Sequence, residues 1–260
     1  MRYLHFGTES IQGAMRLKKP DSIELEYAQQ MMAWMLFLDH ASAPLHIAQL
    51  GLGAASLTKF CYRLFSEPKV TAVELNPDVI AAARTMFRLP VEDERLSVIE
   101  GDAWDYVGDA ANSGQLDVLQ VDLYDASARG PVLDSAAFYQ ACRACLREPG
   151  VITVNLFGDH PSFAKNMKAL RAAFDGRVVA LPDVHEGNRI AIAFTGASVE
   201  LEWAELYCRA DSIESRTGLS ARTWVDGLRE SESDKPNRPA TARMGPEWVV
   251  TGDAVHRFRV

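Results

Sequence analysis

Short apolar runs that alternate with amphipathic helical segments constrain the fold of this 260-residue chain more than any other feature of its sequence. Such runs are typical of strands buried on both faces, and parallel strands need helical crossovers between them. The pattern therefore predicts an α/β fold, a mostly parallel sheet with helices on both faces. The five expected strands are Leu45–Leu50, Val70–Glu74, Arg95–Glu100, Leu116–Val121 and Val151–Asn155.

The regions on either side of this alternation have simpler patterns. Two further runs, Arg177–Leu181 and Arg189–Thr195, flank a turn and are expected to form an antiparallel pair that completes a seven-stranded sheet. Before the sheet, we expect a short β extension over residues 1–20 and a helix from Asp21 to about His40. Residues 197–260 contain two helical patterns and a polar, Pro-containing segment, which predict a helical and partly flexible appendage.

Charge and apolar content narrow the classes of partner. The net charge is −8, whereas nucleic-acid binding uses clustered Lys and Arg. The longest apolar run, Met31–Leu38, is too short to span a bilayer, and the N-terminal MRYLHFGTES lacks the apolar segment of a signal peptide. We therefore expect a cytoplasmic protein without nucleic-acid or membrane partners. The sequence is compatible with a homodimer.

A glycine-containing loop follows the first expected strand of the sheet. Gly51 permits a sharp turn there, and Gly53 permits close approach of the backbone to a ligand. Glu74 ends the next strand, where a carboxylate can accept hydrogen bonds from two ribose hydroxyls. A tight strand–helix turn alone would also explain the glycines, but the combination favours a nucleoside site. These residues taken alone would equally fit a nicotinamide dinucleotide.

Carboxylates also follow the third and fourth expected strands. Asp102, before Ala103, can accept a hydrogen bond from an adenine amino group, or cap the helix that follows, or do both. Asp122 and Asp125 are three residues apart at the end of the fourth strand, at the edge where open parallel sheets bind ligands. Such a pair can hold an ammonium group, and one carboxylate can take its proton. The alternative is a solvated turn with local capping.

Cysteine and histidine spacing does not indicate a metal site. Cys142 and Cys145 form a C-x-x-C pattern, but they lie in a helical segment without a second pair nearby. Core packing is therefore favoured over zinc or redox chemistry, and no metal is expected.

With these residues in place, the chain resembles the polyamine aminopropyltransferases, the spermidine synthase family. The most specific piece is LDVLQVDLYDASARGP, which is similar to the family's strand, Asp-x-x-Asp and following Gly-Pro. The resemblance implies that Asp122 deprotonates the incoming amine and that Asp125 helps to hold it. It implies decarboxylated S-adenosylmethionine as the co-substrate, and polyamine biosynthesis as the setting.

The remaining motifs extend the resemblance from about Gln12 to Thr195. The stretches Ile47–Gly53, Val73–Asn76 and Gly101–Ala103 resemble the family's glycine loop, ribose-binding acid and adenine-contacting Gly-Asp. By the same resemblance, Tyr27 lines the substrate pocket and Gln12 contacts the donor. The implied fold is that of the Rossmann-like S-adenosylmethionine-dependent methyltransferases, with residues 21–196 as its nucleoside-binding catalytic domain.

Three positions depart from the family pattern. Ala54 occupies the position of a family Asp that binds the donor's ammonium. Ala28 replaces the family's His or Gln, and Gln29 replaces its Glu. We therefore expect a spermidine synthase-like transfer of an aminopropyl group to a small amine such as putrescine, with two alternatives left open. One is S-adenosylmethionine-dependent methyl transfer on the same scaffold, and the other is nucleoside binding without turnover.

Overall fold

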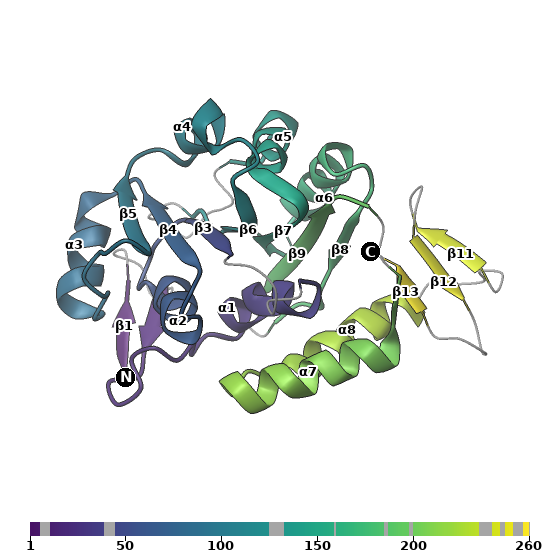
Figure 1. Cartoon of the computed structure of the whole chain (residues 1–260), viewed down its shortest axis with the longest axis horizontal. Coiled ribbons are helices and arrows are strands. Elements are labelled where there is room, and N and C mark those ends of the chain that lie inside the picture. Colours follow the sequence, from purple (N-terminus) through teal and green to yellow (C-terminus); the bar gives the residue numbers. More distant parts are fainter. Residues whose placement is uncertain are drawn as a thin grey trace.

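The computed structural model describes residues 1–5, 11–38, 45–124, 133–158, 160–184, 187–197, 200–233, 241–244, 248–251 and 257–259. Its centre is a seven-stranded sheet with the strand order β5-β4-β3-β6-β7-β9-β8 (Figure 1). Strands β3 to β7 run parallel, and β9 is antiparallel to both β7 and β8. The predicted fold class and the antiparallel closing pair are therefore confirmed. The strands are β3 (His46–Leu50), β4 (Lys69–Glu74), β5 (Leu96–Glu100), β6 (Leu116–Val121), β7 (Leu146–Phe157), β8 (Val178–Ala180) and β9 (Asn188–Thr195).

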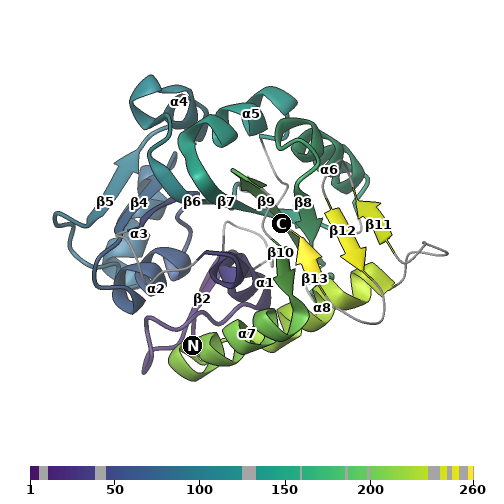
Figure 2. The same ribbon diagram turned by 45° about the vertical axis from the view of Figure 1, so that its right-hand side comes forward.

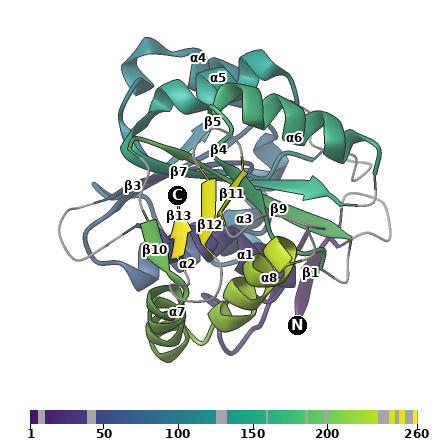
Figure 3. The ribbon, with the colours of Figure 1, turned by 90° about the vertical axis from the view of Figure 1, so that its right-hand side faces the viewer.

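Helices cover both faces of this sheet. Figure 3 shows it between a layer made of α4, α5 and α6 and an opposite layer that includes α7 and α8. The first layer packs a core that includes Phe138 and Leu170, and the second packs one that includes Trp34, Phe194 and Trp224. The helices are α1 (Glu26–Gln30), α2 (Ser56–Leu64), α3 (Pro77–Met86), α4 (Ala103–Gly108), α5 (Ala136–Cys145), α6 (Ser162–Ala173), α7 (Trp203–Thr217) and α8 (Ala221–Ser233), with 3₁₀ segments at Met31–Leu36 (η1) and Ala110–Asn112 (η2).

The N-terminal region is a hairpin followed by a helix shorter than the sequence predicts. Strands β1 (Arg2–Leu4) and β2 (Gly13–Met15) pair antiparallel. The helix expected from Asp21 to about His40 is instead the five-residue α1 and the 3₁₀ segment η1. The carbonyl of Met31, at the junction, accepts side-chain hydrogen bonds from Gln120 at 3.0 Å and Thr153 at 3.2 Å. Bonds from the sheet thus hold the backbone where an uninterrupted α-helix was expected.

The C-terminal region combines the two predicted helices with strands that the sequence did not indicate. Helices α7 and α8 pack against each other (Figure 2), and Arg209 of α7 donates a 2.8 Å bond to the carbonyl of Leu36. Strand β10 (Glu200–Glu202) pairs with β13 (Arg257–Arg259), and β11 (Thr241–Met244) pairs with β12 (Trp248–Thr251). None of the helices in the described ranges has the length and apolar character needed to cross a membrane.

The two cysteines of the C-x-x-C pattern are core residues, as predicted. Cys142 and Cys145 lie on α5 with exposed fractions of 0% and 1%. Burial raises the pKa of the Cys145 thiol to about 11, so the reactive thiolate is disfavoured. Within the described ranges, no three His, Cys, Asp or Glu side chains gather in a way that could hold a metal ion.

Candidate active site

The carboxyl ends of β3, β4, β5 and β6 bring most of the predicted site residues to one edge of the sheet. Backbone hydrogen bonds continue the pairing past the strand ends, from Gly51 N to Val73 O and from Gly101 N to Glu74 O. Asp122 N likewise donates to Leu50 O at 2.9 Å. The backbone beyond each strand is thereby fixed relative to its neighbour. Side chains from four strands are consequently presented on one rigid rim, where doubly wound sheets bind ligands.

Gly51 is required by the close approach of the neighbouring strand. Its φ is +94°, and a Cβ built on it would lie 2.1 Å from the carbonyl oxygen of Asp122. A side chain at this position is therefore excluded by sterics and disfavoured by backbone conformation. The glycine loop and the backbone of Asp122 abut directly.

Glu74 is oriented by the glycine loop. Its carboxylate accepts hydrogen bonds from the backbone N–H of Leu52 at 2.9 Å and of Asn76 at 3.0 Å. These bonds fix the carboxylate beside the loop and leave it further lone pairs for a ligand. Leu75 follows Glu74 and is 68% exposed, an unusually high exposure for a large apolar side chain. It lies next in the chain to the candidate ribose-binding residue.

Asp102 caps helix α4, one of the two roles that its position suggested. Its carboxylate accepts a 2.7 Å bond from the N–H of Trp104, and its side chain remains exposed. Ala103 is buried in the core beneath it. Trp104 is 41% exposed and stacks on Phe138 with ring centroids 6.1 Å apart. Exposed Leu75 and Trp104 are apolar candidates for the nucleoside site that sequence reasoning missed.

Asp122 is held from two sides. Its Oδ1 accepts a 2.8 Å hydrogen bond from Nδ2 of Asn155, and its Oδ2 accepts a 3.4 Å bond from the hydroxyl of Tyr27. Burial raises the pKa of the Asp122 carboxyl, both hydrogen bonds oppose that rise, and the charge of Glu74 adds to it. The result is a partly buried carboxylate with a raised pKa, which is the character of a general base. Tyr27, which was expected only to line the substrate pocket, thus contacts Asp122 directly. Asp125, which was expected beside Asp122, lies outside the described residues.

A chain of amides behind Asp122 was not found by sequence reasoning. Asn188 donates a 2.9 Å bond to Oδ1 of Asn155, and its Nδ2 lies 3.4 Å from the hydroxyl of Tyr124. Asn155 and Asn188 are 1% and 8% exposed. Because β9 is antiparallel, its first residue, Asn188, reaches the edge at which β7 ends. The available signal was a pair of polar residues inside otherwise apolar strands.

The segment that carries Tyr27 is anchored to the same face of the sheet. Gln120 lies two residues before Asp122, so the two side chains leave β6 on one face. Gln120 is held by Gln49 at 3.0 Å, and it donates to the carbonyl of Met31 four residues after Tyr27. The sheet therefore fixes the segment that carries Tyr27. The hydroxyl of Tyr27 donates its hydrogen bond to Asp122.

Ala54 and Gln12 connect the glycine loop to the N-terminal hairpin. The Ala54 side chain is 3% exposed and packs with Met15, and a Cβ on Gly13 would lie 2.4 Å from it. A Cβ on Gly53 would lie 3.5 Å from the carbonyl of Gln12, so Gln12 borders the loop. The position at which the resemblance implied an Asp is therefore an apolar contact with β2 in this chain.

The seven-stranded sheet, in which only β9 runs antiparallel and lies beside the terminal strand β8, is the sheet of the S-adenosylmethionine-dependent methyltransferase fold. The family model of the spermine/spermidine synthase domain matches residues 27–175, and the chain belongs to that family. A curated relative named polyamine aminopropyltransferase, from Neisseria meningitidis serogroup A, is 33% identical over 89% of this chain and 86% of its own length.

Two further similarities frame the family membership. The crystal structure of a probable spermidine synthase from Corynebacterium glutamicum has a TM-score of 0.66 at 20% identity, covers 85% of this chain and is itself covered to 84%. This likeness concerns the fold. A human protein named eEF1A lysine and N-terminal methyltransferase is 26% identical over 70% of this chain but only 28% of its own length. The same scaffold therefore occurs in proteins named for two kinds of transfer.

Proposed function

We propose that this protein transfers an aminopropyl group from decarboxylated S-adenosylmethionine to a small amine such as putrescine, with Asp122 as the general base. The observation that carries the proposal is the Asp122 carboxylate, held by Asn155 and Tyr27 beside the glycine loop. Family membership supports aminopropyl transfer as the reaction class.

The donor would lie along the rim formed by the strand ends. Gly51 would let the loop turn at the strand end, Gly53 would let the backbone approach the nucleoside, and the lone pairs of Glu74 would accept from the ribose hydroxyls. Asp102 would accept from the adenine amino group while it caps α4, with Ala103 beneath it and Gln12 on the donor's other side. A sulfonium carbon is already activated, so the protein's contribution is to position the amine in line and to deprotonate it.

The chemistry then needs one proton acceptor. An alkylammonium has a pKa near 10.4, so its lone pair becomes available only after a base removes a proton. That proton passes to Asp122, the amine nitrogen bonds to the carbon next to sulfur, and the carbon–sulfur electron pair stays on sulfur as neutral methylthioadenosine. A raised pKa brings Asp122 closer to the amine in basicity and strengthens it as a base. Tyr27 and Asp125 would hold the amine groups of the acceptor.

The direct test supplies the purified protein with decarboxylated S-adenosylmethionine and putrescine and follows methylthioadenosine by mass spectrometry. Calorimetric titration with S-adenosylmethionine, its decarboxylated form and methylthioadenosine gives the donor preference. Formation of methylthioadenosine together with an aminopropylated amine supports the proposal. If neither donor is consumed with a broad panel of di- and polyamines, the function is nucleoside binding without turnover.

Methyl transfer is the second candidate, favoured by the apolar packing of Ala54. An Asp at this position would pair with the ammonium of the decarboxylated donor, and its replacement removes a contact specific to that donor. S-adenosylmethionine would then serve, and the product would carry a methyl group. The mass of the modified amine separates the two reactions.

A further inference from the structure

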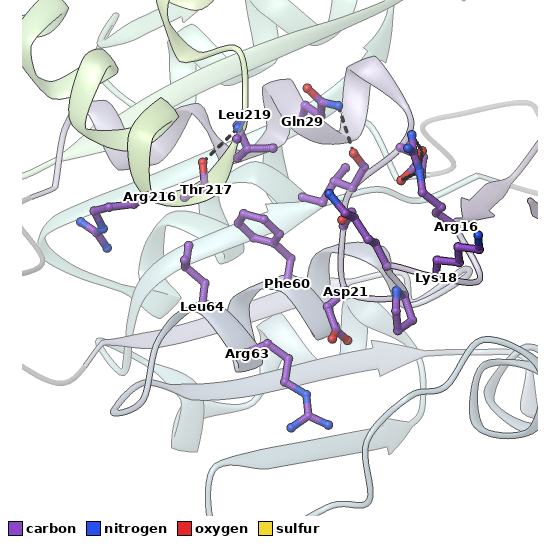
Figure 4. Close-up of a pocket in the computed structure, with 16 residues that line it drawn as sticks. Arg16, Lys18, Asp21, Gln29, Phe60, Arg63, Leu64, Arg216, Thr217 and Leu219 are labelled. Carbon is purple, nitrogen blue, oxygen red and sulfur yellow. Dashed lines mark hydrogen bonds and ion pairs between the residues drawn. The ribbon is translucent and has the colours of Figure 1, made fainter.

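A cavity lies away from the strand ends, between residues 16–24, helix α2 and the turn that joins α7 to α8 (Figure 4). Its volume is about 710 Å³, which falls within the range of small-molecule sites, roughly 300–1,000 Å³. None of the residues proposed above for the donor or for the acceptor lines it. We refer to it as the basic pocket.

The charge of the basic pocket is opposite to that of the whole chain. Its described lining carries two carboxylates, Asp21 and Glu24, against five cationic side chains, which are Arg16, Lys18, Lys19, Arg63 and Arg216. The chain as a whole has a net charge of −8. A concave surface that gathers cations on an acidic protein focuses a positive potential and attracts anions.

Most of these cations have no carboxylate partner among the described residues. Glu24 is engaged by Arg16 at 2.8 Å. Among the ion pairs of the described chain, none involves Lys18, Lys19, Arg63 or Arg216. All four side chains are exposed. Their charge is therefore available to a ligand.

The floor of the basic pocket is apolar. Phe60 and Leu219 are 7% and 4% exposed, and Leu64 lies beside them on α2. In Figure 4, Phe60 lies in the middle of the lining residues, with Arg216 on one side and Arg16 and Lys18 on the other. A ligand that fits both features carries negative groups around an apolar or aromatic body. A polyamine has the wrong charge, so this cavity is no second acceptor site.

We propose that the basic pocket binds an organic phosphate with an aromatic or apolar body, of the nucleotide class. Arg63 and Arg216 would pair with phosphate oxygens, which guanidinium groups bind in two-pronged geometry, and Phe60 would pack against the body of the ligand. The proposal is independent of the aminopropyl transfer proposed above.

Calorimetric titration of the full chain with ADP, inorganic phosphate and adenosine tests this assignment. We expect saturable binding of ADP that weakens as salt is raised, and weaker binding of the other two probes. The double variant Arg63→Ala/Arg216→Ala should lose at least tenfold in ADP affinity. Arg171→Ala, an exposed arginine on α6, is the matched control and should change it less than twofold.

Glu74→Ala separates this site from the proposed nucleoside site. ADP affinity that survives Glu74→Ala and falls in the double variant supports the basic pocket, whatever the outcome of the turnover assay. The proposal is overturned by absence of saturable ADP binding, by loss of binding in Glu74→Ala alone, or by equal affinity for inorganic phosphate. Light scattering adds one more contrary outcome: a fall in oligomer mass in the double variant would place a second copy of the chain on this surface.

Discussion

Nδ2 of Asn155 donates a 2.8 Å hydrogen bond to Oδ1 of Asp122 from the neighbouring strand. This bond stabilises the charged carboxylate and so lowers the pKa of Asp122 against the effect of burial. The pKa of Asp122 therefore depends in part on Asn155, a residue that need not touch the substrate. If Asp122 is the base, we expect Asn155 to act as a positioning residue with a signature in the pH profile.

Replacing Asn155 by Leu should move the acid limb of the kcat/KM profile to higher pH. The variant loses the hydrogen bond to the ionised form, so Asp122 becomes protonated at a higher pH and stops accepting protons there. Glu74→Gln should move the same limb to lower pH, because the charge of Glu74 raises the pKa of Asp122. Limbs that stay in place in both variants would show that Asp122 does not govern the profile.

Asp122→Asn should lower turnover by roughly 10²–10⁴-fold, the usual contribution of a positioned acid–base group. The amide keeps the shape of the side chain but cannot accept the proton, so affinity for methylthioadenosine should change little. Asp105→Asn, an exposed change in the first turn of α4, is the control for loss of a carboxylate. An Asp122→Asn enzyme with most of its turnover would exclude the assigned role.

Glu74→Ala should weaken methylthioadenosine binding by about 1–3 kcal/mol, measured by calorimetry. The change removes the proposed acceptor for the ribose hydroxyls, and it also frees the N–H groups of Leu52 and Asn76. A thermal melt must therefore accompany the titration, and Glu94→Ala, at an exposed position before β5, serves as the control. Unchanged affinity in a folded Glu74→Ala protein would contradict the nucleoside assignment.

Lys59→Met should stabilise the fold at neutral pH by about 1–2 kcal/mol, after allowance for its lost hydrogen bond to the carbonyl of Phe87. Burial, the main cause, lowers the pKa of Lys59 from 10.5 to about 8. Below about pH 8 the lysine is charged in both states and the full burial penalty acts. Between pH 8 and 10.5 only the unfolded state keeps the proton, so the free energy of unfolding of the wild type rises with pH toward that of the variant. Urea unfolding at pH 7.5 and pH 10 measures this convergence, and a constant difference would refute it.

Gln30→Met should raise the free energy of unfolding by about 1–2 kcal/mol. Gln30 is 8% exposed, and among the described residues no donor reaches its buried Oε1, so the wild-type side chain carries an uncompensated desolvation cost. Met fills a similar volume without a polar oxygen. The measurement is urea unfolding, with turnover recorded in parallel. A destabilised variant would mean that the oxygen has a partner in solution.

The sheet and the placement of the glycine loop and of Glu74 at its edge were readable from sequence because both are local patterns. Each strand of the sheet has a short apolar run; Gly51 directly follows one of these strands, and Glu74 ends the next. The role of Asp102 as a helix cap also followed from its position before α4. Such features need only chain neighbours and the geometry of parallel strands.

Features that depend on tertiary contacts were not readable. The 3₁₀ segment after Gln30 reflects bonds that Gln120 and Thr153 make to the Met31 carbonyl from distant strands. Asn188 reaches Asn155 only because β9 runs antiparallel to β7. Ala54 was identified as a departure from the family pattern, but its packing against β2 is visible only in three dimensions.

The contact between Gly51 and the backbone of Asp122 joins two parts of the site that sequence motifs treat separately. Any side chain at position 51 must displace the carbonyl of Asp122, and the carboxylate moves with that backbone. A substitution at Gly51 would thus displace the proposed base directly, through the backbone. In a library of loop variants, substitutions at Gly51 should therefore lower turnover, as substitutions at Asp122 do. Changes at positions 51 and 122 should also occur together among related sequences.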